Sequence, residues 1–228
     1  KAATYGTKAD DPFGNTDVFG FQGIMSSPGF NARSGAWSGT GNVHSFDLRA
    51  ANSLAYWTPK FQGVSGKVQW STDESKNATG IVNPTLYAAA VNFEMGGLSA
   101  VAAVELHEDG FGLRPITGAN TGIKPSKDMA WRLSAGYELP LAGLGALTVM
   151  GMFEQLSYSQ DEAAGAADLE DYSRMAWLLG AKFRAGNHEL RARYAQGLNP
   201  DCTLAGGVDC GDVEDLGAQQ FALGYAYH

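Results

Sequence analysis

Large apolar side chains alternate with small or polar ones at a period of two residues over most of the chain after residue 48. In segment 131–139, for example, Trp131, Leu133 and Tyr137 share one face, while Arg132 and Glu138 lie on the other. This alternation is the pattern of a β-strand with two chemically different faces. We predict nine strands, at 49–59, 64–72, 85–95, 98–107, 129–139, 146–158, 174–184, 189–196 and 218–227. The chain is therefore expected to be all-β.

Short and long connections alternate strictly between the predicted strands. The turns near 60–63, 96–97, 140–145 and 185–188 are short, whereas segments 73–84, 108–128, 159–173 and 197–217 are long and polar. Outer-membrane barrels have this wiring, and strands of about 9–11 residues cross a bilayer core when tilted. A soluble β-sandwich also alternates, but it has no physical reason to collect its long loops at one end. We therefore predict a transmembrane antiparallel β-barrel with short periplasmic turns and long extracellular loops.

Composition argues against several other classes of protein. With 16 Lys and Arg against 24 Asp and Glu, the net charge of −8 is a poor electrostatic match for nucleic acid. No uncharged apolar run reaches the roughly 18 residues of a transmembrane helix. No Cys/His cluster has the spacing of a zinc site, and we expect neither a metal nor a cofactor. Cys202 and Cys210 are a candidate disulfide of an oxidising compartment, with two free thiols as the alternative.

Residues 8–48 differ from the rest of the chain. They are rich in Gly, Ser, Asn and Asp, and they include Phe13, Phe19, Phe21, Phe30 and Trp37. A structureless stretch of about 40 residues in a compact domain is either functional or a sign that its elements have been misassigned. Its aromatic residues indicate that it packs against something. We expect residues 1–228 to form one barrel domain, with 8–48 folded inward as a constriction loop and 49–227 supplying the strands.

The run RAANSLAYWTPKFQG at 49–63 resembles the strand after the constriction loop of Gram-negative general porins. The sequences DPFG at 11–14 and DVF at 17–19 are similar to the start of that loop, and 220–227 is similar to the strand before the last hairpin. Members of that family have sixteen strands, whereas this chain shows nine and a short stub at 1–7. The resemblance implies the middle of a porin without its first and last strands. A closed ten-stranded barrel is the alternative.

The resemblance implies a homotrimeric channel in the bacterial outer membrane for passive diffusion of ions and small hydrophilic solutes. Its partners would be outer-membrane lipid and other copies of the chain. Such a channel needs a polar lumen that narrows where charge can select. The resemblance further implies basic residues on the wall opposite acidic residues on the loop. The wall candidates are Arg49, Lys67, Arg132, Lys182, Arg191 and Arg193, with Glu94 and Glu105 on the same face, and the loop candidates are Asp10, Asp11, Asp17 and Asp47. Each of these charges is also consistent with a solvated side chain or a structural ion pair.

Two other functions are compatible with the same fold. A barrel plugged by its own 8–48 segment would be a structural anchor in a larger envelope assembly. An outer-membrane barrel enzyme would need a histidine and a carboxylate held beside a nucleophile or an activated water. His107 shares a face with Glu105, but ordinary alternation produces this too, and the GxSxG and HExxH motifs are absent. We therefore predict that the protein is not an enzyme.

Overall fold

The structure, a computed structural model, describes residues 12–13, 24–25, 46, 52–72, 84–109, 126–160, 169–204, 208–209 and 217–228. In these ranges the chain forms one sheet of eleven strands, and every strand pair is antiparallel. The strands are β1 (Ser53–Trp57), β2 (Val64–Thr72), β3 (Thr85–Met95), β4 (Leu98–Glu108), β5 (Ser126–Leu141), β6 (Gly145–Gln160), β7 (Leu169–Ala185), β8 (His188–Gly197), β9 (Asp201–Leu204), β10 (Val208–Asp209) and β11 (Ala218–Tyr227). The all-β, antiparallel prediction is confirmed.

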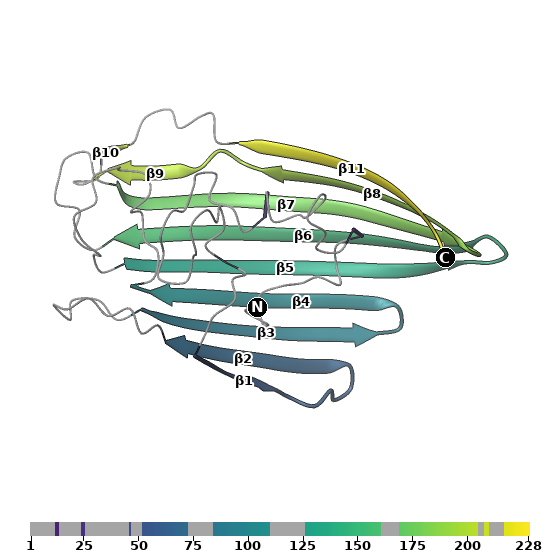
Figure 1. Cartoon of the computed structure of the whole chain (residues 1–228), viewed down its shortest axis with the longest axis horizontal. Helices are drawn as coiled ribbons and strands as arrows, with labels where there is room; N and C mark the ends of the chain where they lie inside the picture. The colour runs from purple at the N-terminus through teal and green to yellow at the C-terminus, as the bar shows by residue number, and fades with distance from the viewer. Residues whose placement is uncertain are drawn as a thin grey trace.

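Nine of the strands form a meander in which each strand pairs with the next long strand of the chain. Their order is β1-β2-β3-β4-β5-β6-β7-β8-β11, with β1 and β11 at the two edges of an open sheet (Figure 1). The short strands β9 and β10 pair with each other. β9 also pairs with the first residues of β7, opposite Leu169–Ser173, and so continues the sheet beyond the residues that pair with β8.

The short turns gather at one end of the sheet, as Figure 1 shows. Two of them have left-handed backbone at both central residues: Gln62 and Gly63 have φ of 47° and 86°, and Gly96 and Gly97 have φ of 58° and 85°. Two-residue turns of this kind match the twist of paired strands and therefore make tight hairpins. The strand ends next to the long connections, such as Thr72, Thr85 and Glu108, lie at the opposite end.

The predicted strands correspond to the nine meander strands, but β5, β6 and β7 are longer than expected. They contain 16, 16 and 17 residues. Most of the additional residues lie at the end that carries the long connections, as in 126–128 of β5 and 169–173 of β7. Apolar alternation marks the part of a strand that faces lipid, so a strand that continues past the bilayer loses the pattern but keeps its backbone pairing. The strands β9 and β10 are too short to show any periodicity.

The two faces of the sheet are inverted relative to those of a soluble protein. One face, which we call the apolar face, exposes large side chains such as Val91 (55% exposed), Leu179 (59%) and Phe221 (66%). The other, the polar face, buries charged side chains, among them Glu105, Asp128, Arg132, Glu154, Arg174, Glu189 and Arg193. Soluble proteins bury the first kind of side chain and expose the second, so this sheet is built to meet a hydrocarbon solvent on its apolar face. Within the described ranges, the structure contains no helix with the length and apolarity to span a membrane.

Candidate functional site

The centre of the polar face holds an ion pair between neighbouring strands. Arg132 of β5 and Glu154 of β6 are direct register partners, and the side chains of both are completely buried. The Arg132 guanidinium donates from Nε to Glu154 Oε2 over 2.9 Å, and its Nη2 donates to the same oxygen. Charge-assisted hydrogen bonds of this kind are among the strongest in proteins, and they hold both side chains in place on the polar face.

A second charged cluster lies nearer the end with the long connections. Nε2 of His107 on β4 lies 2.8 Å from Glu105 Oε1 on the same strand, and Nδ1 lies 3.9 Å from Asp128 Oδ2 on β5. All three side chains are completely buried. The ring of Phe46 stacks on the His107 imidazole with their centroids 4.6 Å apart. This cluster places two carboxylates beside a histidine whose ring is stacked on an aromatic side chain.

A third, mainly basic group lies on β7 and β8 towards the turns. Lys182 of β7 is the register partner of Arg191 of β8. Arg191 donates from Nε to Glu189 Oε1 over 2.6 Å. Arg193, two residues further along β8, donates from Nη2 to Gln220 Oε1 on β11 over 2.7 Å. The basic side chains therefore concentrate on β7 and β8, whereas Glu105 and Asp128 lie on β4 and β5.

The described residues of the N-terminal segment pack against this same polar face. Phe13 is 7% exposed, and its ring centroid lies 5.3 Å from Arg193 Cζ. Met25 belongs with Ile24 to a buried cluster formed with Met152, Ala176, Leu178 and Ala195. Phe46 packs in a cluster with Ala90, Ala103, Ala130, Leu156, Tyr158 and Tyr172. These contacts come from β3 through β8, so the described parts of the segment are distributed widely across the face.

The structure describes seven of the predicted charged candidates: Lys67, Glu94, Glu105, Arg132, Lys182, Arg191 and Arg193. Glu94 lies beside a turn, where Lys60 Nζ donates to its Oε2 over 2.7 Å, and so it is remote from the central pair. Lys67 lies in the same cross-strand row as Arg132, with Ala90 and Ala103 between them. The other five candidates, Asp10, Asp11, Asp17, Asp47 and Arg49, lie outside the described residues.

Four buried charged residues of the polar face were missing from the predicted candidates, and Glu189, which accepts from Arg191, is one of them. Glu154 lies on the predicted face and completes the Arg132 pair, so cross-strand complementarity would have found it. Arg174 Nε donates to Leu198 O over 3.0 Å, just where the chain leaves β8. Asp128 lies among the first three residues of β5, which precede the apolar alternation and were not predicted to belong to the strand.

Cys202 is disulfide-bonded. It lies on β9 opposite Tyr172 and packs against the cluster that contains Phe46. The pairing with Cys210 stays a prediction, because Cys210 lies outside the described residues. A disulfide at this position would tie the last long connection to the polar face.

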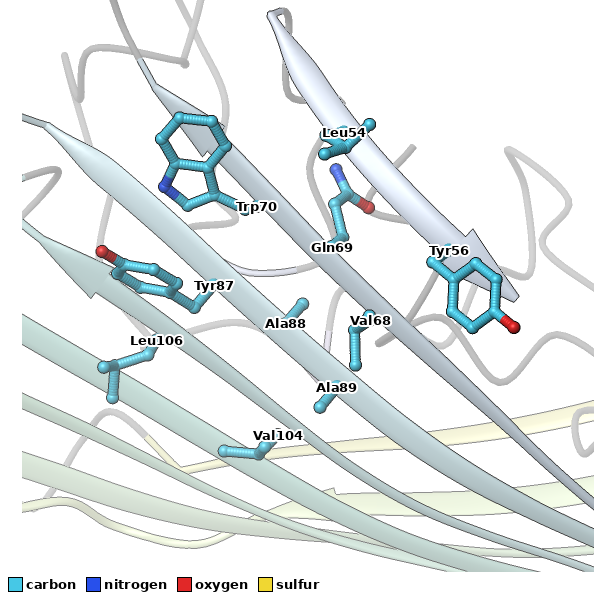
Figure 2. A pocket seen from close by; sticks show the side chains of 10 residues that line it. All are labelled: Leu54, Tyr56, Val68, Gln69, Trp70, Tyr87, Ala88, Ala89, Val104 and Leu106. Carbon is cyan, nitrogen blue, oxygen red and sulfur yellow. The ribbon is translucent and has the colours of Figure 1, made fainter. Parts of the chain in front are cut away.

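The apolar face carries a shallow hollow of about 530 Å³ over β1 to β4. Figure 2 shows its walls: Leu54 and Tyr56 of β1, Val68 and Trp70 of β2, Tyr87 of β3, and Val104 and Leu106 of β4, with the small Ala89 among them. The hollow is therefore a depression around the small side chain of Ala89, with larger apolar and aromatic side chains around it. Among all the described side chains, no set of three or more His, Cys, Asp or Glu residues is arranged to hold a metal ion.

Comparisons with known proteins agree with this architecture. A sequence model described as Gram-negative porin matches residues 3–228. Among solved structures, the anion-selective porin from Comamonas acidovorans is similar to this chain, with a TM-score of 0.61 and 21% sequence identity. The similarity covers 89% of this chain and 49% of that porin, so the chain spans about half of its length. At this identity the likeness establishes the fold. No curated protein matches the chain.

Proposed function

Since the chain belongs to the Gram-negative porin family and is therefore part of an outer-membrane β-barrel protein, we propose that the whole protein forms a water-filled channel. Ions and small hydrophilic solutes would diffuse through it passively. The polar face of the sheet would line the lumen, and the apolar face would contact lipid. Family membership supports a channel over a barrel enzyme.

The observation that carries this proposal is the inversion of the two faces. Charged side chains such as Arg132, Lys182 and Glu105 lie on one face, and the large exposed side chains of the other are apolar. A barrel that encloses water in a membrane has this arrangement, because lumen-facing and lipid-facing residues alternate along each strand. Fixed charges on the lumen wall then act on passing ions through a narrow, poorly screened aqueous space.

We further propose that residues 8–48 form the constriction. The support is that Phe13, Met25 and Phe46, which are spread along this segment, all pack on the polar face. A segment held there occupies part of the lumen cross-section. The acidic candidates of the segment, Asp10, Asp11, Asp17 and Asp47, would then face the basic residues of β7 and β8.

A plugged structural barrel is the second candidate, and complete burial of Arg132 and Glu154 favours it. Single-channel recording of the purified protein in a planar bilayer separates the two functions. A channel gives discrete current steps that scale with salt concentration. Absence of current from protein whose β-structure and insertion have been verified would reject the channel and favour the anchor.

We propose a homotrimer as the assembly. The hollow around Ala89 on the apolar face and the small side chains Ala100 and Ala102 nearby would let two barrels approach closely. Chemical cross-linking in native membranes, followed by electrophoresis, tests this assembly. Cross-linked species of up to three copies, and none larger, support the trimer. Ala89→Trp should reduce the cross-linked species in favour of single copies. Val149→Trp, on the apolar face of β6, is the control and should leave them unchanged. Monomers throughout would contradict the trimer without affecting the channel proposal.

A further inference from the structure

We propose that Gly180 of β7, Arg193 of β8 and Gly224 of β11 form a socket that holds the dipeptide Pro12-Phe13 and thereby positions the constriction. This inference rests on the proposed channel function. It assigns positioning roles to two strand glycines, which would otherwise be unfavourable choices in the middle of paired strands. We call this group of three residues the socket.

The two glycines leave space that the dipeptide fills. A Cβ atom added to Gly180 would lie 2.9 Å from Pro12 Cγ and 3.0 Å from Pro12 Cδ. A Cβ added to Gly224 would lie 2.7 Å from Phe13 Cε1. Carbon atoms do not approach this closely without a shift, so any larger residue would push the dipeptide away from the wall. Close approach of another segment is a recognised reason for glycine within a strand.

Arg193 forms the remaining wall of the socket. Its Cζ lies 5.3 Å from the centroid of the Phe13 ring, within the range of a cation–π contact. Its Nη2 donates to Gln220 Oε1 over 2.7 Å, which restrains the guanidinium across β8 and β11. Arg193 is 1% exposed and Phe13 is 7% exposed, so this contact is sheltered from water. A cation–π contact is stronger when it is desolvated.

Strand register brings the three residues together. Arg193 is the direct partner of Gly180 on one side and of Ala222 on the other. Gly224 follows Ala222 by two residues and therefore lies on the same face of β11. The socket thus spans three adjacent strands towards the turn end of the sheet, whereas Phe46 packs beside His107 at the other end. The segment is consequently held near both of its ends.

A double-mutant cycle in the whole protein tests the contact. The variants are Gly224→Ala, Phe13→Leu and the two combined, because leucine lacks the ring atom that the added methyl group would meet. Phe13→Ala empties the socket. The matched control is Gly136→Ala on the polar face of β5, where a Cβ would meet Ser99, Met150 and Val149 rather than the N-terminal segment.

The first readout is amide hydrogen exchange of peptides from residues 8–24 in lipid vesicles, which does not depend on channel activity. Phe13→Ala and Gly224→Ala should each accelerate exchange in these peptides by about tenfold, while Gly136→Ala leaves them unchanged. The combined variant should exchange more slowly than Gly224→Ala alone. Unchanged exchange in Phe13→Ala, or simple additivity in the cycle, would overturn the socket.

The second readout is the single-channel current. Phe13→Ala, which empties the socket, and Gly224→Ala, which fills it, should both show larger current fluctuations within the open state than the control Gly136→Ala. Faster exchange with a steady current would reject the positioning of the constriction, although the contact itself would stand. If the unsubstituted protein passes no current, the channel proposal fails, and the exchange data still decide whether Pro12-Phe13 occupies the socket.

Discussion

Arg132 and Glu154 face each other directly across β5 and β6, and two nitrogens of one guanidinium donate to a single carboxylate oxygen. Both side chains are completely buried on the polar face. Neither charge is therefore presented to water as a separate ion. The pair links β5 to β6 across the middle of the polar face. In a channel, Lys182 and Arg191, which are only partly buried, would be better placed to act on passing ions.

Removing one member of this pair should destabilise the barrel strongly. Glu154→Ala leaves the Arg132 cation buried without its carboxylate, and we expect a loss of about 3 kcal/mol in the free energy of unfolding. The double variant Arg132→Met/Glu154→Met buries no charge and should lose less. Urea unfolding in lipid vesicles, followed by tryptophan fluorescence, measures both. Equal losses would show that the charges are not coupled.

Arginine on the apolar face should be costly. Val91→Arg or Leu179→Arg places a cation in the hydrocarbon, and each should lower the free energy of unfolding by about 2–4 kcal/mol if the position is near the bilayer midplane. Leu179→Phe keeps the apolar character and is the control. Refolding into lipid vesicles over a urea series gives the comparison. A loss near zero for both arginine variants would mean that this face does not contact lipid.

If the polar face lines a channel, charge reversal on it should change ion selectivity in a fixed direction. Lys182→Glu replaces a cation on the polar face, so the channel should shift towards cations whatever its starting preference. Lys127→Glu makes the same change at an exposed position on the opposite face of β5 and should have no effect. Reversal potentials in a salt gradient measure the shift. A shift of equal size in both variants would contradict the assignment of faces.

The disulfide of Cys202 should stabilise the last long connection. If Cys202 pairs with Cys210, the closed loop is short, and reduction should cost about 2–3 kcal/mol of stability by loop entropy. The variant Cys202→Ser/Cys210→Ser should match the reduced protein. Unfolding with and without a thiol reductant gives the difference. Alkylation of two cysteines in the unreduced, denatured protein would show that this intramolecular pair does not exist.

If residues 8–48 constrict a channel, shortening this segment should widen it. Deleting residues 15–40 removes the Ile24 and Met25 contacts with Leu178 and Ala195 but keeps Phe13 and Phe46. Single-channel conductance should rise, because less of the lumen is occupied. A ten-residue deletion within 111–124, in a predicted external loop, should change it much less. Conductance that stays equal or falls after the first deletion would argue against an inward constriction.

Much of the fold was predictable because each membrane-facing strand carries its own signal. The alternation of Trp131, Leu133 and Tyr137 with Arg132 fixes both the strand and its two faces without any long-range information. The lengths of β5, β6 and β7 were underestimated because residues such as 126–128 and 169–173 have no lipid to face. The strands β9 and β10 carry too few residues for a periodicity to be visible.

The polar face was less predictable than the fold. Alternation placed Arg132 and Glu105 on the correct face, but the sequence does not state which strand residues become register partners. The Glu154 pairing depends on the hairpin register of β5 and β6, and the Phe46–His107 stack depends on contacts between residues 61 positions apart in the chain. Such contacts are set by strand register and tertiary packing, so they cannot be predicted from periodicity alone.

The length of β5, β6 and β7 has an electrical consequence. At about 3.3 Å per residue, strands of 16 or 17 residues are longer than a tilted crossing of the hydrocarbon requires. The excess would stand outside the membrane as a rigid collar. An ion entering from that side would traverse the collar before it reaches the membrane-embedded section, so the two sections act as resistors in series. Widening the constriction would then raise the current towards a limit set by the resistance of the collar.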